Sequence, residues 1–399
     1  MTLEKPTILV MAEYYLPGYE GGGIIRAVSS LVEKLGDEFQ FKIITRDRDI
    51  NSTVPYSTVS IDSWNSIGKA EVLYLSPKKR SLQHIQYLLR KTSYELLYLN
   101  GLFDRTFSIF PLLLRRIGSI PKRPVIIAPR GVLLAGSIGS KAFKKRIYLF
   151  FSKKIGLYHN LIWQASSNAE EKSIQLFFNA SQQICIAPDL PPFASENSYF
   201  SRKKQSGKLK ILFFSRIAPV KNLHGALEVL QHSKGKIQFN IYGPVDDHNY
   251  WEHCQKKFCL LPKNVEVQYL GGVSYAGVPE MMKGHHLLFL PTLSENFGYV
   301  MLEAFINGLP VLISDQTPWC ELETKNAGWD ISLENSSQFC SIIQECVDMK
   351  QQEYERWAKG AWQYGKDHIQ SETNLQKNRL VFKKAFLTSQ SRNQCISLA

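Results

Sequence analysis

Residues 287–304 read LLFLPTLSENFGYVMLEA, and this stretch indicates the kind of fold. The apolar run Leu287–Leu290 predicts a buried parallel strand, and the pattern after the glycine predicts a helix from Tyr299 to about Asn307. Glu295 and Gly298 then lie in the loop that joins the two elements. A strand that leads through a short loop into a helix is the repeating unit of an α/β protein with a parallel sheet.

The same alternation extends along both halves of the chain. Apolar runs that predict strands occur at Thr7–Met11, Phe41–Thr45, Leu96–Leu99, Val125–Ala128, Lys210–Phe214, Gln238–Tyr242, Val265–Tyr269, Leu287–Leu290 and Pro310–Ser314. The first run is followed by a helical pattern whose apolar face consists of Ile25, Val28, Leu31, Val32 and Leu35. From Gln351 to Phe386 the sequence is charged and mostly helical.

A change in composition separates two domains. The chain is proline-rich at Pro188–Phe193, and Ser195–Lys210 is polar and basic, which predicts a linker. We therefore expect an α/β fold with two Rossmann-like domains, residues 1–195 and 196–365, that face a central cleft. We expect the helical segment 366–399 to pack back on the first domain.

The overall composition limits the class of protein. A chain of 399 residues with 44% hydrophobic residues can fill two cores. The formal net charge of +13 indicates an anionic partner, which is a phosphate group, nucleic acid or an acidic membrane surface. Seven cysteines without a CxxC pair, the lack of a signal-peptide pattern and the lack of an apolar run of ~18–20 residues predict a cytoplasmic protein. Such a protein rests, at most, on the inner face of the cytoplasmic membrane.

Two cations follow the first strand of the second half. Residues 214–222 read FSRIAPVKN, so Arg216 and Lys221 lie where α/β folds bind ligands. Arginine offers a planar fork for phosphate oxygens and lysine offers a compact charge, and together they would neutralise a diphosphate without a metal. The alternative interpretation is two exposed cations on a basic protein.

Two carboxylates lie on either side of the glycine turn. The amides of Asn296, Phe297 and Gly298 at the start of a helix would form an anion site. Glu303 lies about two turns into the helix, where it would accept hydrogen bonds from a vicinal diol such as a ribose. The alternative is that Glu295 and Glu303 are solvated helix charges, and Glu295 would then mildly stabilise the start of the helix.

The two motifs together resemble a known enzyme family. SRIAPVKN with SENFGYVMLEA, followed by GLPV at residues 308–311, is similar to the large family 4 of retaining glycosyltransferases, which have the GT-B fold. Residues 314–319 (SDQTPW) and 128–131 (APRG) resemble a bacterial branch that builds surface polysaccharides such as lipopolysaccharide, O-antigen, capsule or exopolysaccharide. The resemblance covers most of Lys210–Trp319 and is patchier in the first half.

The resemblance implies roles for the matching positions. The donor-binding residues that it implies are Gly22, Gly23, Arg216, Lys221, Glu295, Asn296, Phe297, Gly298 and Glu303. Arg216 and Lys221 would hold the donor diphosphate, Glu303 would bind the nucleotide ribose, and Glu295 with the three amides would hold the donor sugar and its phosphate. The glycine loop would close over the phosphates. The donor would be UDP- or GDP-linked, the acceptor a glycan or a lipid-linked sugar, and no metal or other cofactor would be required.

The first half departs from the family pattern at one position. Many members carry His or Asp after the strand that corresponds to Leu96–Leu99, whereas this chain has Asn100, which cannot act as a general base. Asn100 is a candidate acceptor or cleft residue, and the acceptor's proton then goes to the backbone, to a neighbouring group or to the donor phosphate itself. Arg130 follows a strand, so it contacts the donor or an anionic acceptor, or it holds a loop in place. The triplet Asp47-Arg48-Asp49 mimics the DxD motif of metal-dependent transferases, but it is far in sequence from the donor motifs. A charged loop is the preferred interpretation, and no metal site is expected.

Residues 141–154 combine six Lys and Arg residues with an aromatic stretch. Lys144, Ile147, Tyr148 and Phe151 recur at helical spacing, which suits either an anionic lipid surface or an ordinary solvated helix face. Three other functions compete with sugar transfer. A nucleic-acid-binding protein would fit the charge, but no recognition motif is present. A GT-B relative with other chemistry, such as epimerisation, fits the motifs, and a hydrolase fits them least.

Overall fold

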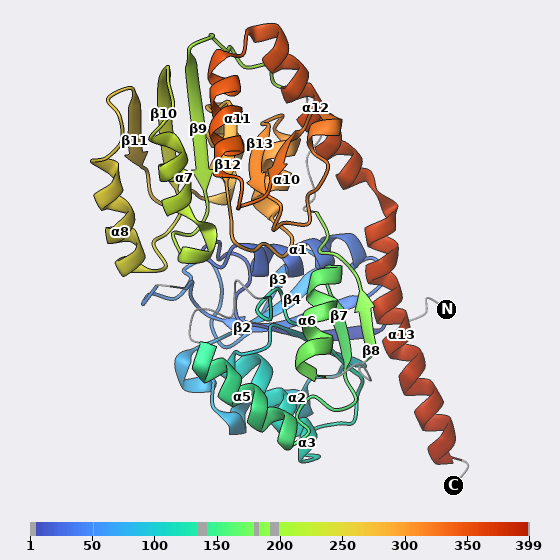
Figure 1. Cartoon of the computed structure of the whole chain (residues 1–399). Helices are drawn as coiled ribbons and strands as arrows, with labels where there is room; N and C mark the ends of the chain where they lie inside the picture. Colours follow the sequence, from blue (N-terminus) through green and yellow to red (C-terminus); the bar gives the residue numbers. More distant parts are fainter. Residues whose placement is uncertain (1–4, 51, 135–141, 179–182, 192–198, 398–399) are drawn as a thin grey trace. The chain divides into compact units, whose positions relative to one another are not determined.

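The computed structural model describes residues 5–50, 52–134, 142–178, 183–191 and 199–397. The chain divides into two compact units (Figure 1). Unit 1 comprises Met1–Phe193 with Glu372–Ala399, and unit 2 comprises Ala194–Ser371. The sequence analysis placed these boundaries at residues 195 and 365.

Unit 1 contains a sheet with the strand order β3-β4-β2-β1-β5-β6-β7-β8. Its strands are β1 (Thr7–Ala12), β2 (Gln40–Arg46), β3 (Trp64–Ile67), β4 (Ala70–Leu75), β5 (Leu96–Asn100), β6 (Val125–Ala128), β7 (Ile162–Ala165) and β8 (Gln183–Ile186). Within the described ranges, β3 is the one antiparallel strand. The main helices are α1 (Gly23–Leu35), α2 (Leu82–Lys91), α3 (Phe110–Arg116), α5 (Ala142–Lys154), α6 (Asn168–Phe178) and α13 (Glu372–Ser397).

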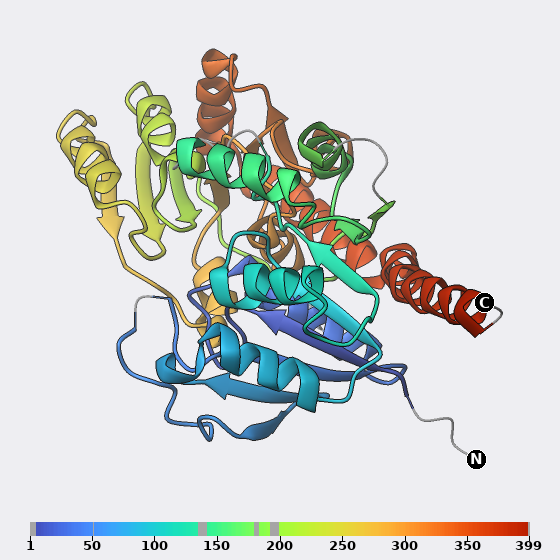
Figure 2. The same cartoon turned by 90° about the horizontal axis from the view of Figure 1, so that it is seen from below.

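Helices cover both faces of this sheet, which explains why its strands are continuous apolar runs (Figures 1 and 2). Successive side chains of β1 alternate between the faces: Leu9 and Met11 pack with α2, α3, α5 and α6. Ile8 and Val10 pack with α1 and α13 on the other face. The apolar face expected for residues 25–35 is buried as predicted.

The C-terminal helix α13 contributes to the core of unit 1. The ring of Phe382 lies 5.4 Å from that of Phe39 and 5.9 Å from that of Tyr98, measured between centroids. Arg379 donates to both carboxylate oxygens of Glu38 at 2.6–2.8 Å. A segment from the end of the chain therefore completes the layer that α1 begins.

Unit 2 contains a parallel sheet with the order β11-β10-β9-β12-β13-β14. Its strands are β9 (Lys208–Phe214), β10 (Lys236–Tyr242), β11 (Val265–Tyr269), β12 (Leu287–Leu290), β13 (Val311–Ser314) and β14 (Gly328–Ile331). Its helices are α7 (Leu223–Leu230), α8 (His248–Phe258), α9 (Val278–Lys283), α10 (Tyr299–Ile306), α11 (Ser336–Asp348) and α12 (Gln351–Gln370). The prediction of two Rossmann-like α/β domains is confirmed.

The linker prediction for Ser195–Lys210 is wrong for the described part of that segment. Arg202 and Lys204 are only 4% and 6% exposed. Arg202 donates to the carbonyls of Met282, Asn307 and Gly308, where α9 and α10 end. Lys204 donates to carbonyls at the end of α11. Cations satisfy the free carbonyls of helix C-termini, so this basic segment belongs to the body of unit 2.

Candidate functional site

The two motifs of the second half meet in unit 2 at the carboxyl ends of β9 and β12. These strands are neighbours in the sheet, and the strand order reverses between them. Such a reversal leaves a crevice outside the strand ends, where open α/β sheets bind ligands. Lys221 follows β9 and Glu295 follows β12, and Lys221 Nζ lies 2.5 Å from Glu295 Oε2. Their side chains are 14% and 15% exposed, so the ion pair is shielded but reachable.

Hydrogen bonds between the two loops fix this ion pair. Asn222, whose φ of 55° is left-handed, caps α7 through its side chain. Its amide group also donates to the carbonyl of Pro291 at 2.9 Å. Thr292 Oγ1 and the amide of Leu293 both donate to the carbonyl of Val220, at 2.9 and 2.8 Å. The loops therefore form one body, and the position of Lys221 relative to Glu295 is set by backbone contacts.

Arg216 lies in the same loop as Lys221 but is far more open. Its side chain is 46% exposed, and Nη1 donates to Asp246 Oδ2 at 2.8 Å. An ion pair this exposed contributes little to stability, so an anionic ligand can compete with Asp246 for the guanidinium. Asp246 was not predicted as a site residue, although it lies in the loop after β10, as Arg216 lies in the loop after β9.

A third segment joins the site at the glycine turn. Gly298 has a φ of 77° and is the N-cap of α10. A Cβ there would lie 2.7 Å from Met301 Sδ and 3.1 Å from Trp319 Nε1, so no other residue fits without a shift. Trp319 Nε1 donates to the carbonyl of Phe297 at 2.6 Å, and the amide of Glu295 donates to the carbonyl of Gln316 at 2.9 Å. The stretch after β13 thus holds the turn from the outside.

The structure excludes the interpretation of both glutamates as solvated helix charges. Glu303 lies in α10 and is 3% exposed. Glu295 lies outside the helix and is bound by Lys221. Glu303 is therefore a buried carboxylate of α10, and Glu295 is a shielded carboxylate in the loop before that helix.

In unit 1, α1 begins at Gly23 with Gly22 as its N-cap. No side chain caps this helix start, and Gly22 has a φ of 59° with a ψ of −125°, a backbone that suits glycine. Asp49 Oδ2 accepts from the amides of Tyr19 and Glu20 at 2.8 and 3.1 Å, and so holds the segment before the glycines.

The triplet at residues 47–49 is engaged in bonds within the protein. Asp47 is 1% exposed and pairs with Arg48 at 2.9 Å and with Arg80 at 2.5 Å. In the part of the chain that the structure describes, no group of three or more His, Cys, Asp or Glu side chains is placed to hold a metal ion. These contacts give the triplet a structural role, as a charged loop.

Asn100 and Arg130 form part of a buried polar network at the reversal of strand order in unit 1, between β1 and β5. Arg130 Nε donates to Asn100 Oδ1 and Nη2 donates to the Tyr98 hydroxyl, both at 2.7 Å. Its Nη1 forms an ion pair with Asp189, and the Arg130 side chain is 5% exposed. Asn100 Nδ2 donates in turn to the carbonyl of Ile24, at 3.3 Å, in the first turn of α1. Of the roles left open for Arg130, these contacts support that of holding loops in place.

Comparisons with known proteins agree with this geometry. Residues 195–363 match the family model described as glycosyl transferases group 1. The structure of HepE from Anabaena with UDP and glucose has a TM-score of 0.65 and 16% identity, over 96% of this chain and 100% of that chain. Sucrose-phosphate synthase from Thermosynechococcus elongatus has a TM-score of 0.67 and 14% identity, over 99% and 100%. WaaG, a glycosyltransferase involved in lipopolysaccharide biosynthesis, has a TM-score of 0.63 and 14% identity, over 94% and 99%.

The chain has the GT-B fold. No curated protein matches it by sequence. Identities of 14–16% establish the fold alone, whereas the family-model match to unit 2 supports the class of glycosyltransferase.

The GT-B unit 1 also contains a charged cluster that sequence reasoning missed. Arg46 Nη2 lies 2.6 Å from Glu13 Oε1 and 2.8 Å from Asp104 Oδ2. Burial, followed by repulsion from Asp104, raises the pKa of Glu13, and Arg46 opposes the shift. The signal was available, because Glu13 directly follows β1 and Arg46 ends β2, which are the carboxyl ends of neighbouring parallel strands.

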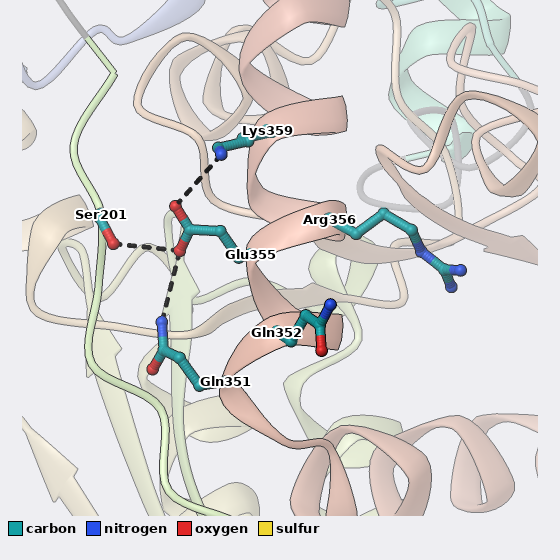
Figure 3. Close-up of a pocket in the computed structure, with 6 residues that line it drawn as sticks. All are labelled: Ser201, Gln351, Gln352, Glu355, Arg356 and Lys359. Carbon is teal, nitrogen blue, oxygen red and sulfur yellow. Dashed lines mark hydrogen bonds and ion pairs between the residues drawn. The ribbon is translucent and has the colours of Figure 1, made fainter.

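A surface cavity of about 540 Å³ on α12 lies apart from these motifs (Figure 3). It is lined by Ser201, Gln351, Gln352, Glu355, Arg356 and Lys359. Ser201 and Gln351 donate to Glu355 at 3.0 and 3.3 Å, while Arg356 points away from it (Figure 3). Lys359 pairs with Glu355 at 4.0 Å, and Arg356 lies over the Trp357 ring. None of the motif residues lines this cavity, so it is separate from the strand-end site.

The glycine turn yields the first testable prediction. Gly298→Ala should lower the free energy of unfolding by about 1–3 kcal/mol, because alanine tolerates neither the left-handed φ nor the contact with Met301. Gly284→Ala is the matched control, since Gly284 has a φ of −73° and ordinary contacts. Denaturant unfolding of both variants measures the difference, and equal stabilities would show that the turn is not constrained.

Proposed function

We propose that the chain is a family 4 retaining glycosyltransferase that moves a sugar from a UDP- or GDP-linked donor to an acceptor hydroxyl. The observation that carries the proposal is the 2.5 Å ion pair of Lys221 and Glu295 at the strand reversal of unit 2. The family-model match to that unit and the HepE structure solved with UDP-glucose support a nucleotide-sugar donor. The likeness to WaaG and the motifs at residues 128–131 and 314–319 support a role in building a bacterial surface polysaccharide.

In the proposed complex the donor diphosphate takes over the partners of both cations. Arg216 exchanges Asp246 for phosphate oxygens, and Lys221 exchanges part of its contact with Glu295. Glu295 is then available to the hydroxyls of the donor sugar. Glu303, a buried carboxylate of α10, accepts hydrogen bonds from the ribose.

The reaction breaks the bond between the anomeric carbon and the diphosphate oxygen, and that oxygen keeps the electron pair. The acceptor oxygen forms the new bond to the anomeric carbon on the same face. Its proton passes to the departing phosphate oxygen, because Asn100 is a neutral amide already bonded to Ile24 and Arg130. Arg216, Lys221 and the start of α10 stabilise the negative charge that develops on the diphosphate.

The diphosphate clamp is tested by removing its charges. Arg216→Ala and Lys221→Ala should each lower kcat/KM by ten- to over a hundredfold, because a hydrogen bond to a charged group is worth roughly 1.5–3 kcal/mol. Lys236→Ala is the control, since this exposed lysine lies at the start of β10, at the opposite edge of the sheet. Steady-state kinetics should separate the clamp variants from the control. A wild-type kcat/KM in both clamp variants would show that the donor diphosphate does not bind at Arg216 and Lys221.

Glu295→Gln should separate nucleotide binding from transfer. The substitution frees Lys221, so the affinity for the nucleoside diphosphate alone should stay the same or increase. The affinity for the intact sugar nucleotide and kcat/KM should fall, by about tenfold or more, because the charged hydrogen bonds to the donor sugar are lost. Calorimetric titration with both ligands measures this. A parallel loss for both would mean that Glu295 acts only by holding Lys221.

Metal independence is part of the proposal, because two cations and a helix start supply the positive charge that a divalent ion would otherwise provide. Transfer should therefore persist in excess chelator at the rate without chelator. Complete loss that manganese or magnesium restores would contradict the proposal and would direct attention to acidic side chains at the strand ends, such as Glu13 and Asp104.

A further inference from the structure

Helix α5 of unit 1 has an exposed apolar face. Ile147, Phe150, Phe151 and Ile155 are 42%, 63%, 59% and 48% exposed. They follow one another at intervals of three, one and four residues, so they form a single stripe along the helix. The rings of Phe150 and Phe151 lie 5.5 Å apart. Large apolar groups gathered in one exposed stripe mark an interaction surface.

Other side chains of α5 pack on the core of unit 1. Leu149 is 5% exposed and Ser152 is 2% exposed. The Tyr148 hydroxyl lies 2.8 Å from that of Tyr158, and its ring packs edge-on against Phe103. The sequence analysis grouped Tyr148 with Ile147 and Phe151 on one side, and the structure separates them. The exposed stripe is therefore not a displaced core face.

The end of α3 extends this stripe. Arg116 Nε donates to the carbonyl of Ile155 at 2.9 Å, and Arg115 donates to the carbonyls of His159 and Asn160 at 3.0 and 2.8 Å. Ile117, which follows them, is 70% exposed. We name the α5–α3 face as the surface formed by Ile117, Ile147, Phe150, Phe151 and Ile155 with Arg115, Arg116, Lys153 and Lys154.

The charge on these segments has one sign. Residues 105–118 contain three Arg and residues 141–160 contain six Lys and Arg, and neither stretch contains Asp or Glu. Lys153 and Lys154 are exposed and lie beside the aromatic stripe. Two copies that met through this face would bring like charges together, which disfavours a symmetric dimer. Aromatic rings rimmed by long cationic side chains suit an interface between lipid tails and anionic headgroups.

We propose that the α5–α3 face docks on an anionic membrane surface, with Phe150 and Phe151 entering the headgroup region and Arg116, Lys153 and Lys154 contacting lipid phosphates. No helix in the described ranges is long and apolar enough to cross a membrane. The inference deepens the proposed function, because it names the surface at which a lipid-linked acceptor would be met. Docking itself does not depend on sugar transfer, so the two ideas fail separately.

The test is flotation of the full chain with vesicles of phosphatidylcholine alone and of phosphatidylcholine mixed with phosphatidylglycerol. The wild-type protein should float with the mixed vesicles only, and added salt should weaken the binding. Phe150→Ser with Phe151→Ser, and separately Lys153→Glu with Lys154→Glu, should each lower the partition coefficient about tenfold or more. Leu260→Ser with Lys256→Glu, on exposed positions of unit 2, should have no such effect.

The outcomes distinguish the alternatives. Equal behaviour with neutral and anionic vesicles, or binding that neither pair of substitutions changes, would overturn the proposal. Loss of binding in the lysine variant alone would show simple electrostatic adhesion and would overturn the insertion of the phenylalanines. A dimer that the phenylalanine variant abolishes would assign the face to a second copy. Titration with UDP and GDP should give wild-type affinity in every variant, because all positions lie outside the donor motifs.

Discussion

The ion pair of Lys221 and Glu295 determines how the rest of unit 2 serves a site. It joins the loops after β9 and β12 at the one place where the strand order reverses. Shielded charges of opposite sign hold each other until an anion arrives, so the loops do not have to reorganise to bring a cation to the site. The position of this pair is fixed by hydrogen bonds to the backbone, because Asn222 donates to the carbonyl of Pro291 and Thr292 donates to the carbonyl of Val220.

Unit 1 repeats the topology but uses it differently. Its strand order also reverses beside its first strand, between β1 and β5, and polar groups gather there as well. However, Arg130 is 5% exposed and is bound by Asp189, Asn100 and Tyr98. Its guanidinium is therefore engaged by contacts within unit 1. Arg216, which follows β9 beside the reversal in unit 2, is 46% exposed, whereas Arg130 follows β6 in unit 1. The same fold thus offers an available cation in one unit and a fixed scaffold in the other, which favours unit 2 for the donor.

The sequence predicted several strands, and Val125–Ala128 and Leu287–Leu290, which are continuous apolar runs, agree to the residue. It missed β4, although Ala70–Leu75 is largely apolar. It missed β14, because Gly328, Trp329 and Asp330 form no such run and are fixed by pairing with β13. It mistook part of Ser195–Lys210 for a linker, because composition does not reveal that Arg202 and Lys204 cap helix carbonyls. In the site, the loop residues followed from motifs, whereas the pairing of Arg216 with Asp246, which lie 30 residues apart in the chain, is visible only in the folded protein.

The cations behind the net charge of +13 fall into three groups with different surroundings. The first group is buried and binds carbonyls and carboxylates within the protein, so it is not accessible to a partner: Arg130, Arg202 and Lys204. Arg216 and Lys221 are paired yet exchangeable, which suits a small anion that must also leave. The cations of the α5–α3 face have no acidic neighbours in their own segments and accompany exposed phenylalanines. Lys153 and Lys154 are exposed in a segment without acidic residues, beside the apolar stripe, and their charge suits an extended anionic surface that would cover this stripe.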